Sequence, residues 1–464
     1  MHLSQNEDPN FSLSKFESML KTNDILFFDS SEFETIIYHY LETGKIALAK
    51  KAVKLGLEQH PTSTHLLLFR VEIYIFENKL EEAEDILASI DHLEPSNEEI
   101  YIQKANVYSK RNRHHKAIEM LQIALELTDD AADVYSLLAM EYLFLEDYEN
   151  AKGNLMACLD IDDEDYSALY NLIFCYENLD QEDQAIAYLG KYIDINPYCE
   201  VAWHQIGKLY NKKKEYKKAL EAYDFAIISD EYFIGAYLEK GKVLEKLNRF
   251  QEAIENYQIT LELDDPTAFA FLRIGKCYEK MGVEDLALHY FNKAVEDDPL
   301  LDKAWIEFTN FYIRKKQFRK ALYYINKALQ IDEENIKYWK KYTYINQKLA
   351  FLEEAERGLR KCLELGNYEL ETYITRADLL IILGEYNMAL QTMFEACEFH
   401  PDYAEIEYRI AGLFFRINEG DKGYYHLKNA VKIDAEYSVI VSELFPDIFE
   451  RDSVKHIIGK YLNK

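Results

Sequence analysis

The chain has 464 residues, a formal net charge of −30 and a hydrophobic content of 48%. Its 16 glycines and 8 prolines supply few of the turns that sheets and long loops require, which favours a mainly helical protein. No run approaches the ~20 apolar residues that span a bilayer, and no basic and apolar secretory signal opens the chain. We therefore expect a cytoplasmic protein with no membrane partner.

Residues 1–29 are predicted as a polar tail followed by a capping helix. The first ten residues, MHLSQNEDPN, are polar and are expected to fray. The segment from Phe11 to Asp29 carries large apolar side chains, among them Phe16 and Met19. We expect these side chains to place a short helix on the region that follows.

A small residue recurs every 34 positions through residues 30–437. The positions are Ala49, Ala83, Ala117, Ala151, Ala185, Ala219, Ala253, Ala287, Ala321, Ala355, Ala389 and Gly423. A strict period of this length indicates an array of twelve repeats, in which two helices approach closely at the small residue. The repeats begin at Ser30, Thr64, Glu98, Ala132, Tyr166, Glu200, Ile234, Ala268, Asp302, Ile336, Leu370 and Ala404.

Other positions keep the same register when the small residue is numbered 20. Position 11 is tyrosine in eight of the twelve repeats and position 32 is proline in five. Because proline ends helices, each repeat is predicted as helix, short turn, helix and linker. The stretch Trp203-x-x-Ile206-Gly207-x-x-Tyr210, followed by an alanine and an aromatic residue four positions later, resembles a tetratricopeptide repeat. This resemblance covers residues 30–437.

The resemblance implies an all-α fold, a right-handed superhelical α-solenoid of stacked helix-turn-helix repeats. Each repeat of a solenoid contacts only its neighbours, so residues 30–437 are predicted as one array. Position 7, which is usually apolar in the family, instead carries Arg70, Lys104, Lys240 and Arg376. We expect these repeats to pack more loosely, or the long side-chain stems to cover apolar surface.

Residues 438–464 are predicted as C-terminal capping helices, broken at Pro446. Ile457, Ile458, Tyr461 and Leu462 are expected to lie against the last repeat. A partner-binding motif in this segment is the alternative interpretation.

The sequence contains no motif for catalysis, for a cofactor or for a metal. A phosphate-binding glycine loop, G-x-S-x-G, H-E-x-x-H and a dinucleotide fingerprint are all missing. The six cysteines include no C-x-x-C pair, so we expect most of them to be buried small residues in a reducing compartment. We predict a non-enzymatic protein that uses no cofactor and no metal.

The resemblance also implies a binding surface, because the first helix of each such repeat lines a concave groove with positions 2, 5, 6, 9, 12 and 13. Over these six positions the formal charge adds up to +9 in repeats six to ten and to −5 in repeats one to five. Position 13 is basic in all five of the later repeats. The predicted groove residues are Lys208, Lys212, Lys242, Lys246, Lys276, Lys280, Asn310, Arg314, Lys340, Lys341 and Lys348.

This basic stripe predicts a scaffold or adaptor that binds an acidic peptide segment or partner protein. One alternative is a merely solvated face, in which Glu245 and Glu279 pair with basic residues across neighbouring repeats. Another is a nucleic-acid- or nucleotide-binding regulator that uses the same lysines, although a net charge of −30 opposes the approach of a polyanion. The identity of the partner and the oligomeric state stay open.

A second candidate surface lies in repeats four and five. Five apolar side chains occupy groove positions there, namely Met140, Leu143, Phe144, Tyr170 and Phe174. They are either apolar anchors for a ligand or residues that a tightly wound superhelix covers. Recognition of a C-terminal carboxylate, known in some family members, is unsupported because Glu307 stands where asparagine would be needed.

Overall fold

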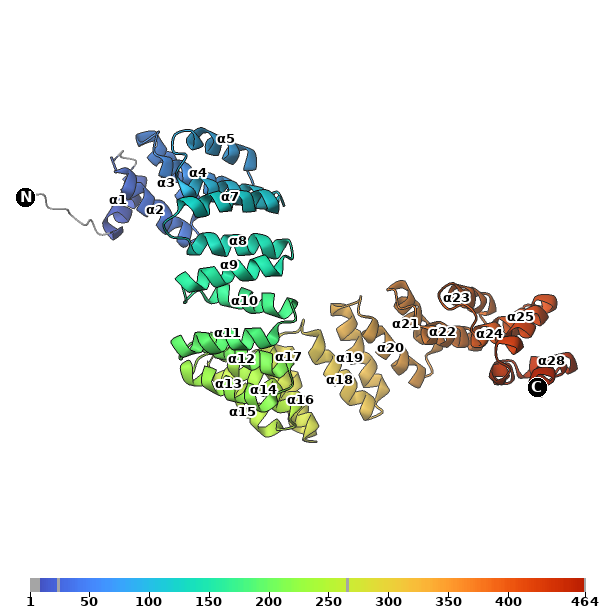
Figure 1. Cartoon of the computed structure of the whole chain (residues 1–464). Helices are drawn as coiled ribbons and strands as arrows, with labels where there is room; N and C mark the ends of the chain where they lie inside the picture. The colour runs from blue at the N-terminus through green and yellow to red at the C-terminus, as the bar shows by residue number, and fades with distance from the viewer. Residues whose placement is uncertain (1–8, 23–25, 264–266, 463–464) are drawn as a thin grey trace, which may run out of the picture. The chain divides into compact units, whose positions relative to one another are not determined.

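The computed structural model describes residues 9–22, 26–263 and 267–462. All regular elements among these residues are helices, and within each of the two compact units most helices pack against their neighbours in chain order (Figure 1). The chain divides into two compact units, residues 1–233 and residues 234–464. The predicted all-α solenoid of helix-turn-helix repeats is confirmed.

The first unit contains helices α1 to α13. Their bounds are Pro9–Thr22, Ser30–Glu42, Ile46–Gln59, Thr64–Phe76, Leu80–Asp91, Glu98–Lys110, His114–Leu127, Ala132–Phe144, Tyr148–Ile161, Tyr166–Asn178, Glu182–Ile195, Glu200–Lys212 and Tyr216–Ser229. The predicted tail, residues 1–10, falls mostly outside the described residues, and α1 begins at Pro9.

The second unit contains the remaining helices. Helices α14 to α25 span Ile234–Lys246, Phe250–Leu263, Ala268–Lys280, Glu284–Asp297, Asp302–Arg314, Phe318–Ile331, Ile336–Lys348, Leu352–Glu364, Leu370–Leu383, Tyr386–Phe399, Ala404–Arg416 and Gly420–Ile433. A 3₁₀ turn, η1, and helices α26 to α28 follow at Glu436–Ser438, Val439–Leu444, Pro446–Phe449 and Asp452–Leu462. The even-numbered helices α2 to α24 begin at the twelve repeat starts read from the sequence. They are therefore the first helices of the repeats.

The small residues at position 20 lie where the two helices of a repeat pack together. All the alanines in this register, from Ala49 to Ala389, are fully buried. In some repeats, a glycine at position 8 of the first helix allows a second close approach between the two helices of the repeat. A Cβ atom on Gly275 would lie 2.6 Å from the ring of Phe291, so the aromatic residue of the second helix can pack only on a glycine there.

The turn between the two helices of each repeat has one constant backbone feature. Position 15 has a positive φ in every repeat, with values from 53° at Asp180 to 80° at Gly282 and Gly384. This left-handed residue ends the first helix and reverses the chain. Glycine, asparagine and aspartate accept the conformation readily, but Lys316 and Ala350 adopt it at a conformational cost.

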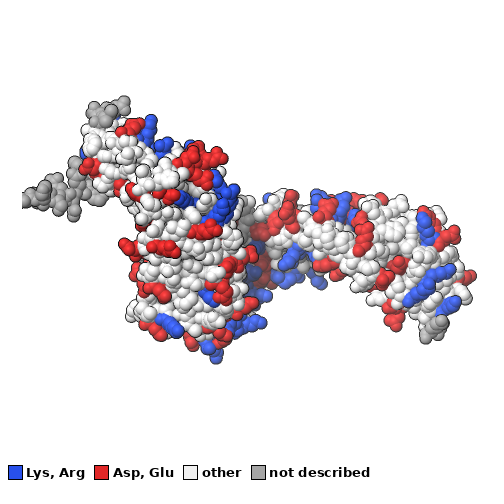
Figure 2. Space-filling view, turned by 45° about the horizontal axis from the view of Figure 1, so that its top comes forward, with Lys and Arg blue, Asp and Glu red and all other residues white. Residues whose placement is uncertain are grey.

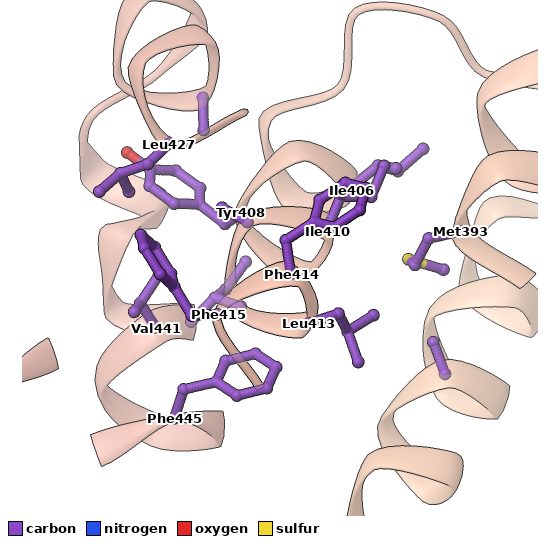
Figure 3. Close-up of a cluster of buried hydrophobic side chains, with 14 of the residues drawn as sticks. Met393, Ile406, Tyr408, Ile410, Leu413, Phe414, Phe415, Leu427, Val441 and Phe445 are labelled. Carbon is purple, nitrogen blue, oxygen red and sulfur yellow. The ribbon is translucent and has the colours of Figure 1, made fainter. Parts of the chain in front are cut away.

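Both ends of the described chain carry aromatic packing against the outermost repeats. Phe16 of α1 contacts Phe28 and Phe33, with ring centroids 5.8 and 6.2 Å apart. At the other end, Phe445 precedes α27 and belongs to the same buried cluster as Phe415 of α24 (Figure 3).

The C-terminal segment differs from its prediction in two details. It forms three short helices after η1 instead of two, because the chain breaks again between Phe449 and Asp452. Ile458 is buried and Tyr461 packs against the same cluster, whereas Leu462 is exposed on the solvent side.

Candidate binding face

The first helices of successive repeats meet along one side of each unit through a fixed set of positions. Position 9 of one first helix contacts position 6 of the next, as Lys276 does with Glu307 at 2.7 Å. Position 12 contacts position 6 or 13 of the next, as Glu245 does with Arg273 at 2.7 Å. We call the surface formed by positions 2, 5, 6, 9, 12 and 13 the first-helix face.

Most of the predicted basic residues of the second unit have a partner on or beside this face. Lys242 pairs with Glu239 in its own helix at 2.6 Å, and Lys340 pairs with Glu369 at 2.6 Å. The ammonium group of Lys341 donates to the side-chain oxygen of Asn310 at 2.8 Å.

Asn310 joins two of these contacts into a network. Its amide nitrogen donates to Glu307 at 3.1 Å, and Glu307 also accepts from Lys276. The network therefore runs from Lys276 through Glu307 and Asn310 to Lys341, across three consecutive repeats.

Glu245 and Glu279 do pair across neighbouring repeats, as the solvated-face alternative supposed. Glu245 accepts from Arg273 and also from the hydroxyl of Tyr257 at 2.7 Å, while Glu279 contacts Arg314. The basic residues are thus partly neutralised by carboxylates of the same face.

The carboxylates in these pairs lie deeper than the cations. The side chain of Glu307 is 13% exposed against 33% for Lys276, and that of Glu279 is 15% exposed against 53% for Arg314. Burial raises the pKa of Glu279, although the neighbouring Arg314 acts in the opposite direction. Solvent therefore meets mainly the positive member of each of these two pairs.

Three predicted lysines of the second unit reach solvent at or near helix ends. Lys246 is exposed at the end of α14. Lys280 and Lys348 are also exposed, and no carboxylate of the described residues lies within ion-pair distance of either. The ammonium group of Lys348 lies 5.5 Å from the ring centroid of Tyr344, a cation–π contact.

The two predicted lysines of the sixth repeat belong to the first unit. Lys212 pairs with Glu182 at 2.7 Å, and this hydrogen bond raises the pKa of Lys212. Lys208 is half-buried, with no ion pair to a carboxylate in the described part of the chain.

The five apolar residues of repeats four and five lie on α8 and α10 of the first unit. Four of them are exposed, and Leu143 packs partly against the core. Phe144 is 59% exposed and stacks on His114 with ring centroids 5.0 Å apart. Met140 accepts a hydrogen bond from Asn171 of the next repeat at 3.7 Å. Four of the five predicted apolar side chains are therefore open to solvent in this unit.

The structure shows which members of the charged network the sequence reasoning missed. Arg273 and Glu307 were not singled out as site residues, yet each bridges two repeats. The sequence does contain a spacing that indicates these pairs. Lys276 and Glu307 are 31 residues apart, and so are Asp378 and Arg409, which also pair. A spacing three short of the 34-residue period places position 9 against position 6.

Within residues 9–22, 26–263 and 267–462, no group of three or more His, Cys, Asp or Glu side chains is placed to hold a metal ion. All six cysteines are free, and burial raises the pKa of Cys158 and Cys175 to about 11. None of the described helices is both long enough and apolar enough to cross a bilayer.

The outer surface carries both signs of charge. Figure 2 shows Lys and Arg side chains interspersed with Asp and Glu side chains on the face that it draws.

Family models described as tetratricopeptide repeat match residues 98–130, 132–165, 167–197, 201–227 and 238–302. No curated protein matches the chain. Among solved structures, two crystal structures of MamA are 24% and 25% identical, cover 37% and 35% of this chain and 94% and 95% of theirs, and both have a TM-score of 0.32. The crystal structure of the APC/C hetero-tetramer Cut9–Hcn1 is 13% identical, covers 86% of this chain and 92% of its own, and has a TM-score of 0.37.

Proposed function

We propose that this chain, which belongs to the tetratricopeptide repeat family, is a non-enzymatic scaffold that binds an acidic segment of a partner protein. Proteins of this family generally bind other proteins. The proposed surface is the first-helix face of repeats seven to ten, residues 234–369. The six free cysteines support the proposed cytoplasmic location, since free thiols are typical of a reducing compartment.

This proposal rests on how deeply the charged side chains of that face are buried. Glu279 and Glu307 lie beneath the cations that they pair with, and Lys280 and Lys348 have no carboxylate partner among the described residues. An approaching carboxylate meets ammonium and guanidinium groups before it meets the glutamates. The local field therefore attracts acidic segments although the chain as a whole carries −30.

The test uses charge reversal of the two unpaired lysines. A fluorescein-labelled oligoglutamate peptide is titrated with the full chain and with Lys280→Glu/Lys348→Glu, and binding is followed by anisotropy at low and moderate salt. We expect the double variant to bind about tenfold more weakly, since exposed charge contacts contribute ~0.2–1 kcal/mol each. Salt should weaken binding of the wild type.

The matched control changes net charge equally on second helices of the same unit. Arg319→Glu/Lys428→Glu alters two exposed residues of α19 and α25 that lie away from the first-helix face. Equal loss in both variants would show that only net charge matters and would contradict the proposed site. Tighter binding of a single-stranded DNA of the same length would favour the nucleic-acid alternative.

Lys208 and Lys212 are tested separately, because they lie in the first unit. If they contribute to the same activity, Lys208→Glu/Lys212→Glu weakens peptide binding in the same assay. Unchanged binding would confine the proposed site to the second unit.

The apolar patch of repeats four and five is the proposed anchor site for apolar side chains of the partner. Phe144 and Phe174 are its most exposed members. Affinity capture with the wild type and with Phe144→Ser/Phe174→Ser compares the partners retained by each form. A partner captured equally by both forms would remove this patch from the proposed function.

A further inference from the structure

Three cavities lie at positions where a basic residue replaces the usual apolar side chain of position 7. They contain Arg70 of the second repeat, Lys104 of the third and Arg376 of the eleventh, and their volumes are about 500, 250 and 280 Å³. In eight other repeats position 7 is apolar, for example Ile36 and Leu138. At each of these three positions the cavity adjoins the long basic side chain.

In two of these cavities the cation already has a carboxylate partner. The ammonium group of Lys104 pairs with Asp91 at 2.8 Å. The guanidinium group of Arg376 is buried and pairs with Glu356 at 2.8 Å. In both cavities the charge of the basic residue is therefore satisfied from within the protein.

The cavity at Arg70 is different. The Nε and Nη2 atoms of Arg70 donate to the hydroxyl oxygen of Tyr74 at 3.0 and 2.8 Å, and the guanidinium lies 5.2 Å from the centroid of that ring. No carboxylate in the described part of the chain lies within ion-pair distance of Arg70. The tyrosine thus holds the guanidinium in place without neutralising it.

The acidic residues around this cavity are already engaged with lysines. Glu77 contacts Lys50 and pairs with Lys79 at 2.9 Å. Glu58 lies 3.9 Å from Lys54, four residues earlier in the same helix. Four basic and two acidic residues line the cavity, which leaves an excess of positive charge.

Apolar side chains complete the lining. Val53 and Leu57 come from α3 and Ile73 comes from α4, so the cavity lies between the second helix of repeat one and the first helix of repeat two. Ligand pockets commonly enclose ~300–1,000 Å³ and combine an apolar lining with a few polar groups. Guanidinium groups suit phosphate and carboxylate because their planar array of donors can bind two oxygens together.

We propose that the cavity between α3 and α4 is a binding site for a small organic anion. The phosphate or carboxylate group of the ligand pairs with Arg70, and its apolar body covers Val53, Leu57 and Ile73. This site is separate from the proposed acidic-segment surface, because position 7 does not belong to the first-helix face and Arg70 lies in the first unit.

The test is a titration of the full chain followed by NMR of labelled Ile, Leu and Val methyl groups. The probes are phenyl phosphate, benzoate, inorganic phosphate and uncharged phenol. We expect the first two to shift the methyl signals of Val53, Leu57 and Ile73. The signals of Leu87 and Val107, which line the cavity at Lys104, serve as the internal reference and should not move.

The probes also show whether the cavity recognises the anionic group, the apolar body or both. Shifts with inorganic phosphate equal to those with phenyl phosphate would show that the anionic group alone is recognised and would overturn the role of the apolar lining. Shifts with phenol equal to those with benzoate would show a merely apolar cavity and would overturn the ion pair.

Arg70→Leu is the decisive variant, since it restores an apolar residue at position 7. We expect it to fold with unchanged helix content and to bind phenyl phosphate at least about tenfold more weakly, the loss typical of a charged hydrogen-bonded pair. Tyr74→Phe removes the hydroxyl that orients the guanidinium and should produce a smaller loss. Binding that is unchanged in both variants would overturn the proposal, as would methyl shifts of equal size at the Lys104 cavity.

Discussion

One pair of positions on the first-helix face makes an uncharged contact in the first unit and an ion pair in the second. In the first unit, Met140 at position 9 contacts Asn171 at position 6 of the next repeat. In the second unit, the same two positions hold Asp378 and Arg409, which form a two-fold hydrogen-bonded ion pair at 2.7 and 2.8 Å. The constant repeat length decides which positions meet, and the side chains decide whether the contact is ionic.

This difference has consequences for stability as well as for binding. The contact of Met140 with Asn171 carries no formal charge, so a change of either side chain leaves no uncompensated charge behind. An ion pair requires both of its members, particularly where one of them is buried. The two faces should therefore respond very differently to single substitutions.

The largest expected effect follows removal of a carboxylate that pairs with a buried cation. The side chain of Arg409 is 8% exposed, and after Asp378→Leu the acceptor that the Arg409 guanidinium keeps among the described residues is the backbone oxygen of Glu405 at 3.1 Å. We expect the free energy of unfolding in urea to fall by ~3–5 kcal/mol. Met140→Leu, at the same position of the first unit, should change it by less than ~0.5 kcal/mol.

A double variant separates charge from packing at this site. Asp378→Leu/Arg409→Leu replaces the whole pair by apolar groups and should recover most of the lost stability. If Asp378→Leu lowers the free energy of unfolding as little as Met140→Leu does, solvent screens the pair of Asp378 and Arg409. The two first-helix faces would then not differ in their response to single substitutions.

A smaller effect is expected at the turns, where the two units are alike. Lys316 in the second unit and Lys214 in the first have φ of 55° and 63°. A left-handed conformation costs a non-glycine residue ~1–2 kcal/mol, and glycine loses ~0.5–1 kcal/mol in backbone entropy. Lys316→Gly and Lys214→Gly should therefore each raise the unfolding free energy by ~0.5–1 kcal/mol.

The control for this prediction is a glycine inside a helix. Lys320→Gly, at an exposed position of α19, should lower the unfolding free energy by ~1 kcal/mol. Stabilisation at only one of the two turns would mean that the units differ in their turns as well as in their first-helix faces.

The repeat register could be read from the sequence because a single steric requirement recurs without insertion. Only a very small side chain fits where the two helices cross, and the fully buried alanines from Ala49 to Ala389 follow from that requirement. The left-handed turn residue was harder to recognise. Glycine or asparagine marks it in most repeats, but lysine or glutamate occupies it at Lys214, Lys316 and Glu146.

The ionic state of the candidate site could not be read from a sum of charges. The sum counts Glu279 and Glu307 as equal to the lysines, whereas the structure places these carboxylates beneath their partners. Pairs such as Lys212 with Glu182 also draw on residues outside the counted positions. Whether a cation is paired depends on its rotamer and on the repeat beside it, neither of which a list of positions contains.

The smallest expected effect concerns two carboxylates on the first-helix face of the first unit. Burial raises the pKa of Glu72, and the neighbouring charge of Glu99 raises it further. The pKa of Glu99 is also raised, mainly by burial. At position 9 of the eighth repeat, by contrast, Lys276 faces a carboxylate of opposite charge, Glu307.

A raised pKa in the folded state means that the native protein binds more protons than the unfolded chain over the interval between the two pKa values. Stability is then highest below the ordinary carboxylate pKa of about 4.3 and falls as the pH rises through the raised pKa.

Glu72→Gln removes this fall in stability and lessens the electrostatic repulsion on the carboxylate of Glu99. We expect the variant to be more stable than the wild type at pH 7.5 by less than ~0.5 kcal/mol, with a smaller difference at pH 5.5. Urea unfolding at both pH values measures this, with Glu119→Gln on α7 as the exposed control. A variant less stable than the wild type at pH 7.5 would mean that Glu72 is stabilised as a carboxylate, and the first unit would then resemble the second.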